Sequence, residues 1–270
     1  MSVYEIVTNK IISELEKGNV PWKKNWSSSY VNYMTKKPYR GINRLLLNLS
    51  GFKCPYFLTF LQAKEMGLSI KKGSNASIVV FYKIDKQIIE NEINDEVILK
   101  NKYILRYYNV FNLEQTDYKG DDLRNFKDNE NAETVIEKYT DCPVITNGDS
   151  AFYTPVFDEI CVPSKNNFSK VDDYYLTLFH EVVHSTGHSK RLSRKGVAGE
   201  IKFGSEIYSE EELIAEIGSN FLCEDCGLNP DFNNSLSYIK GWLSLLKDDK
   251  RIIVFAAGQA EKACEYIKGL

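Results

Sequence analysis

Two histidines four residues apart, with a glutamate directly after the first, are the residues whose spacing most clearly allows chemistry. His180, Glu181 and His184 form an HExxH motif inside residues 172–186, where apolar residues recur at the period of a helix. Residues four apart lie on the same side of a helix, so both imidazoles can bind one tetrahedral zinc ion. Glu181 is rotated by about 100° around the helix, so its carboxylate can reach a water molecule at the metal without being a ligand. The motif therefore predicts a zinc hydrolase site with Glu181 as the catalytic base.

The third metal ligand must come from outside this motif. Metzincins use a histidine six residues after the second histidine, and that position is Lys190 here. The next helical segment instead carries Glu212 and Glu216, which share one face. The pattern resembles that of zinc peptidases with a glutamate ligand, and the resemblance implies that Glu212 binds zinc while Glu216 accepts the N–H of a ligating histidine. The alternative is that Ser209 and Glu212 form a capping box at the helix start, which would leave Glu216 as the ligand.

Other charged residues lie near the motif in the sequence. Arg191 and Arg194 follow the histidine helix, where they could clamp a carboxylate or a phosphate of a ligand, or be solvated or salt-bridged. Glu210 and Glu211 stand at the start of the next helix, where acidic side chains stabilise the positive end of the helix dipole. We expect these two glutamates only to stabilise that helix.

The elements that must position these residues divide the chain into two units, and the expected fold class is α+β. Residues 1–120 read as a small α+β domain, residues 121–144 as a polar linker with a leading helix, and residues 145–270 as a mainly helical domain. Helices are expected at residues 1–18, 42–49, 57–66, 132–139, 171–186, 209–223, 235–246 and 252–267, and strands at 77–84, 103–112 and 151–162, with a hairpin excursion across 85–101.

Charge is unevenly distributed between the two units. Residues 1–120 carry 18 Lys and Arg against 11 Asp and Glu, whereas residues 121–270 carry 16 against 26. In the first unit cations interleave with aromatic residues, a combination that suits single-stranded DNA because cations follow phosphates while rings stack on unpaired bases. The alternative is that the rings belong to the core and the charges to a solvated face. The residues expected to contact DNA are Trp22, Lys23, Lys24, Lys36, Lys37, Tyr39, Arg40, Arg44, Lys71 and Lys72.

The composition also bears on the compartment. No stretch approaches the roughly 18 consecutive apolar residues of a membrane helix, so we expect no membrane partner. Acidic residues interrupt residues 1–18, unlike a secretory signal. Six cysteines scattered through 270 residues are typical of reduced thiols rather than of a disulfide framework. These features together predict a cytoplasmic protein.

Several short sequence motifs, occurring in one order along the chain, resemble those of the ArdC-type antirestriction proteins. The resemblance covers nearly the whole chain and implies a single-stranded-DNA-binding N-terminal domain followed by a zincin-like metallopeptidase domain of gluzincin type. Such proteins are carried by plasmids, phages and conjugative elements, and they shield incoming DNA from host restriction. The acidic segment 85–101 is longer than this family leads us to expect. The matching motifs are residues 39–43, 56–67, 78–84 and 107–112, then 174–179 leading into the HExxH motif, 211–216 and 246–251.

The combined expectation is an antirestriction protein of a mobile genetic element. Residues 1–120 would bind single-stranded DNA, and residues 145–270 would be a zinc-dependent metallopeptidase whose peptide target the sequence does not specify. Two alternatives remain open. One is a DNA-binding protector with a purely structural zinc site that hydrolyses nothing, and the other is an accessory protein of a primase-type DNA-processing system.

Overall fold

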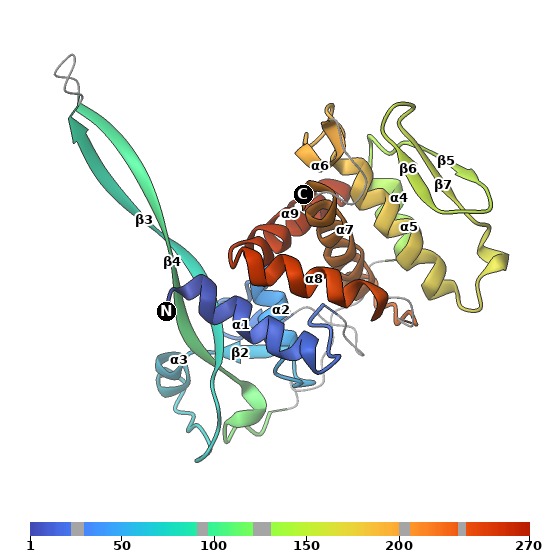
Figure 1. Ribbon diagram of the computed structural model, residues 1–270. Coiled ribbons are helices and arrows are strands. Elements are labelled where there is room, and N and C mark those ends of the chain that lie inside the picture. Colours follow the sequence, from blue (N-terminus) through green and yellow to red (C-terminus); the bar gives the residue numbers. More distant parts are fainter. Residues whose placement is uncertain (23–29, 91–96, 121–130, 200–205, 232–235) are drawn as a thin grey trace.

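The structure of the chain is a computed structural model that describes residues 1–22, 30–90, 97–120, 131–199, 206–231 and 236–270. It is a mixed α+β fold, with a sheet-containing N-terminal region and a mainly helical C-terminal region (Figure 1). This confirms the fold class expected from the sequence. Within the described residues, no helix combines the length and the apolar character that a bilayer crossing requires.

The N-terminal region packs short helices against a four-stranded sheet of order β1-β2-β4-β3. β1 and β2 are parallel, and the other neighbouring pairs are antiparallel. The first helix begins at a capping box, in which the side chains of Ser2 and Glu5 each accept the backbone N–H of the other residue. The elements are α1 (Val3–Glu16), β1 (Val31–Asn32), α2 (Ile42–Asn48), β2 (Tyr56–Leu58), α3 (Phe60–Glu65), β3 (Ser77–Glu90), β4 (Val97–Asn112) and a 3₁₀ turn at Leu113–Gln115.

Strands β3 and β4 form a long antiparallel pair, here called the ribbon, that projects from the rest of the molecule (Figure 1). Its register runs without a break from the pair Ser77–Val110 to the pair Glu90–Val97. The strands therefore extend into the segment 85–101, for which the sequence suggested only a hairpin excursion. Isoleucine, leucine and valine residues within that segment favour an extended backbone in spite of its acidic composition.

The C-terminal region places a small sheet beside a group of helices. The sheet has the order β5-β7-β6, with β5 parallel and β6 antiparallel to β7. The single strand expected at 151–162 is divided into two by a turn at Pro155–Asp158, where Asp158 has a φ of 51°. The elements are α4 (Ala132–Lys138), β5 (Val144–Asn147), β6 (Phe152–Thr154), β7 (Glu159–Val162), a 3₁₀ turn at Lys165–Asn167, α5 (Val171–Thr186), α6 (Lys195–Ala198), α7 (Glu206–Asp225), α8 (Leu236–Asp248) and α9 (Ile252–Ile267).

One hydrophobic core joins the two regions. Ile11 of α1 and Leu45 of α2 belong to the same buried cluster as Ile253 of α9. The indole of Trp22 is 2 % exposed and meets Trp242 of α8 edge-to-face, with 5.1 Å between the ring centroids. The N-terminal helices thus complete the apolar packing of the helical region that carries the HExxH motif.

A buried arginine adds a polar contact between the regions. Arg44 of α2 is 3 % exposed, and its Nη2 lies 2.9 Å from Oε2 of Glu224 and 2.9 Å from Oδ1 of Asp225, at the end of α7. Its guanidinium also lies 4.1 Å from the ring centroid of Phe221. Burial by itself would lower the pKa of Arg44, but the carboxylates around it, including Glu261 of α9, raise the pKa by more. The net shift is upward, so the guanidinium stays charged.

Candidate metal centre

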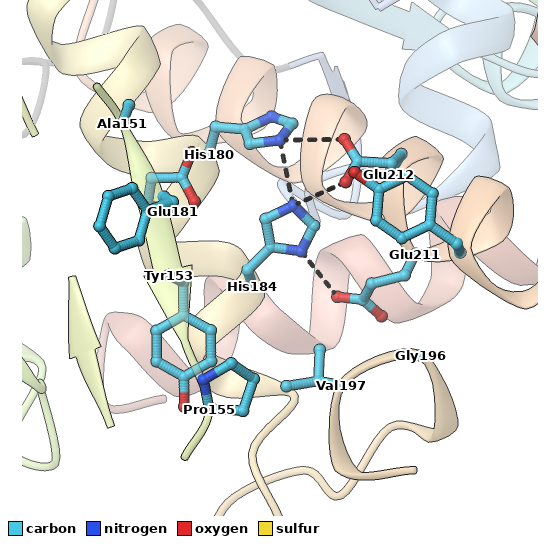
Figure 2. A pocket seen from close by; sticks show the side chains of 12 residues that line it. Ala151, Tyr153, Pro155, His180, Glu181, His184, Gly196, Val197, Glu211 and Glu212 are labelled. Atoms are coloured by element: carbon cyan, nitrogen blue, oxygen red, sulfur yellow. Dashed lines mark hydrogen bonds and ion pairs between the residues drawn. The ribbon is translucent and has the colours of Figure 1, made fainter. Parts of the chain in front are cut away.

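Two helices bring three metal-binding side chains together. His180 and His184 lie one turn apart on α5, with 3.1 Å between their Nε2 atoms. Glu212 of α7 faces both, with its two carboxylate oxygens each 3.5 Å from one histidine Nε2. Figure 2 shows both imidazoles directed toward this carboxylate. Among the described residues, this is the one group whose ligand atoms lie close enough to hold a metal ion, all within 4.8 Å of one another.

The spacing of these atoms fits a zinc ion. Ligands at about 2.0–2.1 Å from a tetrahedral zinc are about 3.3–3.4 Å apart, and the measured separations of 3.1 and 3.5 Å bracket that value. Two imidazoles and one carboxylate also form a usual ligand set of catalytic zinc. The residues present therefore fit the metal that the motif predicts.

A buried carboxylate fixes the orientation of His184. Nδ1 of His184 lies 3.2 Å from Oε1 of Glu211, so Nε2 of His184 is the nitrogen that remains for a metal. Arg194 holds Glu211 with two bonds, from Nε at 2.9 Å and from Nη2 at 2.7 Å. The same guanidinium donates to the hydroxyl of Thr186 and to the carbonyl of Val183 on α5. The loop after α5 thus locks both the histidine helix and its carboxylate partner.

The electrostatics of the centre favour a cation. Burial by itself would lower the pKa of His184, but the hydrogen bonds and charges of Glu211 and Glu212 raise it to about 10. Burial raises the pKa of Glu212, and the two histidines lower it by more, so that carboxylate stays ionised. Arg194 and His184 likewise outweigh burial and lower the pKa of Glu211. Two ionised carboxylates therefore face the imidazoles.

The distance between the two helices depends on a glycine. Gly218 of α7 packs against Val183 of α5, and a Cβ atom at Gly218 would come within 2.9 Å of a Val183 methyl carbon. That separation is shorter than van der Waals contact, so a larger residue fits only if the Val183 side chain or one of the helices shifts. The close approach of α5 and α7 keeps Glu212 within reach of the histidines.

The centre opens into a pocket of about 510 Å³. Strand β6 forms one wall, and Glu181 lies on the side of the pocket lined by Ala151 and Tyr153 (Figure 2). The carboxylate of Glu181 therefore faces the space that a substrate would occupy. It does not join the three metal-binding side chains.

Strand β6 is held against α5 by a second arginine. Arg191 forms an ion pair with Asp158, in the turn between β6 and β7, and its Nε donates to the carbonyl of Ser185 at 2.7 Å. The hydroxyl of Tyr153 on β6 donates to Asp158 at 2.8 Å. Of the two possibilities that the sequence left open, Arg191 and Arg194 both have the salt-bridged role, with carboxylates of the protein itself.

Comparisons with known proteins match two families to separate parts of the chain. Residues 1–111 match the family described as the N-terminal domain of anti-restriction factor ArdC. Residues 130–259 match the zincin-like metallopeptidase family, and this stretch contains the whole metal centre.

The solved structure of a relative decides the family. The metal-free crystal structure of the antirestriction protein ArdC from plasmid R388 superposes with a TM-score of 0.81 at 34 % identity, covering 99 % of this chain and 97 % of that one. This chain belongs to the ArdC antirestriction family. A second structure of R388 ArdC, described as Mn(II)-bound, gives a TM-score of 0.80 at 33 % identity.

ArdC-like sequence also occurs inside longer proteins. The DNA primase TraC of Escherichia coli is 30 % identical over 288 residues, and the match takes up 98 % of this chain. The chain spans only 20 % of that primase and 27 % of a second TraC primase.

The structure settles the position of the glutamates that the sequence left open. Glu212 lies in the metal-binding group, and Glu216 does not. The expectation that Glu216 accepts a histidine N–H is wrong for His184, because Glu211 occupies that position. The expectation that Glu211 only stabilises its helix is also wrong. Adjacent residues on a helix point about 100° apart, so Glu212 reaches Nε2 of His184 while Glu211 reaches Nδ1 on the other side of the same ring.

Three of the residues expected to contact DNA are buried in this ArdC protein. Trp22, Tyr39 and Arg44 are 2 %, 7 % and 3 % exposed. The assignment of Trp22 and Tyr39 as stacking rings is wrong, because neither presents an open face to a base. Arg44 is wrong as a phosphate contact, because its charge is neutralised within the protein.

The other expected DNA contacts are mostly at the surface. Lys36, Lys37, Arg40, Lys71 and Lys72 are exposed. The ammonium of Lys36 lies 4.0 Å from the ring centroid of Tyr33, and Arg40 pairs with Glu265 of α9. Lys23 and Lys24 lie outside the described residues.

Proposed function

We propose that this ArdC protein protects the incoming DNA of a mobile genetic element from restriction, in the cytoplasm, by binding single-stranded DNA and hydrolysing a peptide bond at a zinc ion. The observation that carries the proposal is the His180–His184–Glu212 group, which opens into a pocket beside a sheet edge. Structural zinc sites are normally closed by four protein ligands, whereas catalytic sites have three and leave a position for substrate. The three ligands and the pocket therefore support a catalytic role rather than a structural one.

The residues of the site supply the parts of a hydrolytic reaction. Zinc, when bound, supplies a Lewis acid that polarises the scissile carbonyl and acidifies water. Glu181 would take the proton from the attacking water and pass it to the leaving nitrogen. Glu211 and Arg194 would hold the ring of His184 in one orientation throughout. The overall reaction adds one water molecule to one peptide bond and yields a carboxyl group and an amine.

An edge strand offers a place for the peptide. β6 pairs on one side with β7, and residues of β6 line the pocket on the way to the metal group. An extended peptide can add to such an edge as a further strand through backbone hydrogen bonds. This mode binds main chain, so it is compatible with many peptide sequences.

The ligand assignment predicts different effects for two neighbouring glutamates. Glu212→Ala is expected to remove most of the bound zinc, because a site with two histidines has lost its only carboxylate ligand, whereas Glu216→Ala should retain about one ion per chain. Elemental analysis of the purified variants after dialysis measures this, and it should include manganese because the relative from R388 was crystallised with Mn(II). Full metal content in Glu212→Ala would refute the assignment.

DNA binding predicts a salt-dependent preference for single strands. The full-length protein is expected to bind a labelled single-stranded oligonucleotide more tightly than its duplex, and log Kd should change by about 0.7 per phosphate contact for each decade of salt. Lys72→Gln should lower this slope by about that amount, because it removes one exposed cation of the ArdC N-terminal domain. Lys190→Gln, which removes an exposed cation six residues after His184, is the matched control and should leave the slope unchanged. If unlabelled duplex DNA competed with the labelled oligonucleotide as well as unlabelled single-stranded DNA does, the proposal would be contradicted.

A second candidate function has one observation in its favour. Nearly the whole chain aligns with a part of the TraC DNA primases. An accessory role beside a primase-type enzyme is therefore the alternative, and in that role DNA binding would persist while Glu181→Gln would have no effect.

A further inference from the structure

The two faces of the ribbon are not equivalent. Because directly opposed residues of an antiparallel pair share a face, Phe81 lies on the same face as its partner Arg106. Tyr108, two residues along β4, shares that face, as does Lys83, two residues along β3. We call this the open face of the ribbon.

The opposite face is covered near its base by the first helix. Val80 and Leu105 on that face are each 6 % exposed and belong to the core that contains α1. The hydroxyl of Tyr82 lies 3.2 Å from the hydroxyl of Tyr4 on α1. Tyr103 lies farther along the same face and is 61 % exposed. α1 therefore covers Val80 and Leu105 on one side of the ribbon, where Tyr82 and Tyr107 remain 49 % and 47 % exposed, and the open face is the other side.

Rings and cations alternate on the open face. Phe81 and Tyr108 are 46 % and 38 % exposed, and their ring centroids are 5.8 Å apart at an interplanar angle of 59°. The two rings are tilted rather than stacked face to face, and both remain partly exposed at the surface. Arg106 and Lys83 are exposed beside them.

The open face continues into the basic segment expected to contact DNA. At its base, Val79 and Val110 pack with Tyr39 in a small cluster. Burial, and to a lesser extent the nearby Tyr108 hydroxyl, raise the pKa of Tyr39 to about 12. Exposed Lys37 precedes Tyr39 by two residues. Tyr39 thus packs against the buried base of the open face, and exposed Lys37 belongs to the same segment of the chain.

We propose that the open face of the ribbon is the surface on which an unpaired nucleic acid strand stacks. Phe81 and Tyr108 are the rings that bases stack on, and Arg106 and Lys83 are the cations that contact phosphates. This inference rests on the proposed single-stranded-DNA binding and gives it a location. Aromatic rings interleaved with cations are the usual composition of surfaces that bind single strands without sequence preference.

The composition of the open face argues against a protein partner. Cores of protein interfaces are enriched in aromatic residues but depleted of lysine, and they bury few charges. Here Arg106 lies directly across from Phe81, and Lys83 lies two residues beyond it on the same face. Association with a second copy would bury these like charges against one another. A second copy is accordingly an outcome that the test must detect.

Fluorescence anisotropy of the full-length protein with a labelled oligothymidylate tests the location. Phe81→Ala and Tyr108→Ala are each expected to weaken binding about 5- to 100-fold, the usual loss for one stacking ring. Tyr108→Phe keeps the ring and should bind like the wild type. Tyr103→Ala removes a tyrosine that is 61 % exposed on the other face of the same ribbon, and it should also bind like the wild type.

The outcomes separate this inference from the proposed function. If the wild-type protein binds no single-stranded oligonucleotide, the proposed DNA binding fails and the location fails with it. If the wild type binds and the two alanine variants bind equally well, the location is overturned while the function stands. Sedimentation that shows a wild-type dimer, dissociated by Phe81→Ala without change in oligonucleotide affinity, would overturn it in favour of self-association. Arg106→Gln leaves both rings in place and should lower the salt dependence of binding. It therefore tests the same face even if the ring variants fail to fold.

Discussion

Replacing Glu181 by Gln is expected to lower peptide hydrolysis by at least about 10²-fold while leaving the metal content unchanged. General acid–base catalysis contributes about 10²–10⁴-fold, and a glutamine of the same shape can neither accept nor return a proton. Glu181 is 8 % exposed and lies outside the metal-binding group, so its loss should not release the ion. Because the target is unknown, the measurement is a comparison of protein fragments, by mass spectrometry, from cells expressing the wild type or Glu181→Gln.

His184→Ala is the control that separates metal binding from catalysis. This variant should lose both the metal and the hydrolysis, since it removes a ligand. If the fragments are the same in all three strains, the protein is not acting as a peptidase there. If a chelator then unfolds the wild-type protein, the structural-zinc alternative is correct.

Arg44→Met is expected to destabilise the fold by about 3–5 kcal/mol. Removing one partner of a buried ion pair leaves the other charge unpaired in a medium of low dielectric constant. Here Glu224 would lose the guanidinium that lies 2.9 Å away, whereas Asp225 would keep its ion pair with Lys268 at 2.7 Å. Urea denaturation of the full-length protein measures the change as a lower midpoint at a similar slope.

Arg40→Ala is the matched control for this prediction. Arg40 precedes Arg44 by four residues in the same N-terminal region, and its ion pair with Glu265 is exposed. Exposed ion pairs contribute about 0–1 kcal/mol, so this variant should unfold close to the wild type. Equal stability of Arg44→Met and Arg40→Ala would mean that the contact between α2 and α7 does not hold the two regions together.

The part of the site that could be predicted from the sequence is the part encoded within single helices. The positions of His180, Glu181 and His184 follow from helical periodicity, and the fold class follows from the succession of periods along the chain. Glu212 and Glu216 could be recognised as one face of a second helix. Which of them meets the histidines depends on how far α7 is shifted along α5, and that shift is set by packing between residues far apart in the sequence.

Which of the N-terminal aromatic and basic residues face solvent could not be predicted, for a related physical reason. A tryptophan or an arginine beside lysines has the same local sequence whether it faces solvent or a distant helix. Arg44 meets its carboxylate 180 residues later in the chain, and Trp22 meets Trp242. The sequence contains no local signal for either contact. Phe81 is one of the aromatic residues that interleave with cations in the sequence, but its exposure and that of Tyr108 cannot be predicted, because alternating aromatics in a strand are equally typical of a core.

Gly218 links the metal centre to a position that binds nothing. The helix carrying Glu212 can approach the histidine helix only because a hydrogen atom, rather than a methyl group, faces Val183. A larger residue at 218 could be accommodated only if Val183 shifted or were replaced by a smaller residue. The two positions therefore constrain one another during evolution, and relatives that differ at one of them would need a compensating difference at the other to keep the same metal site.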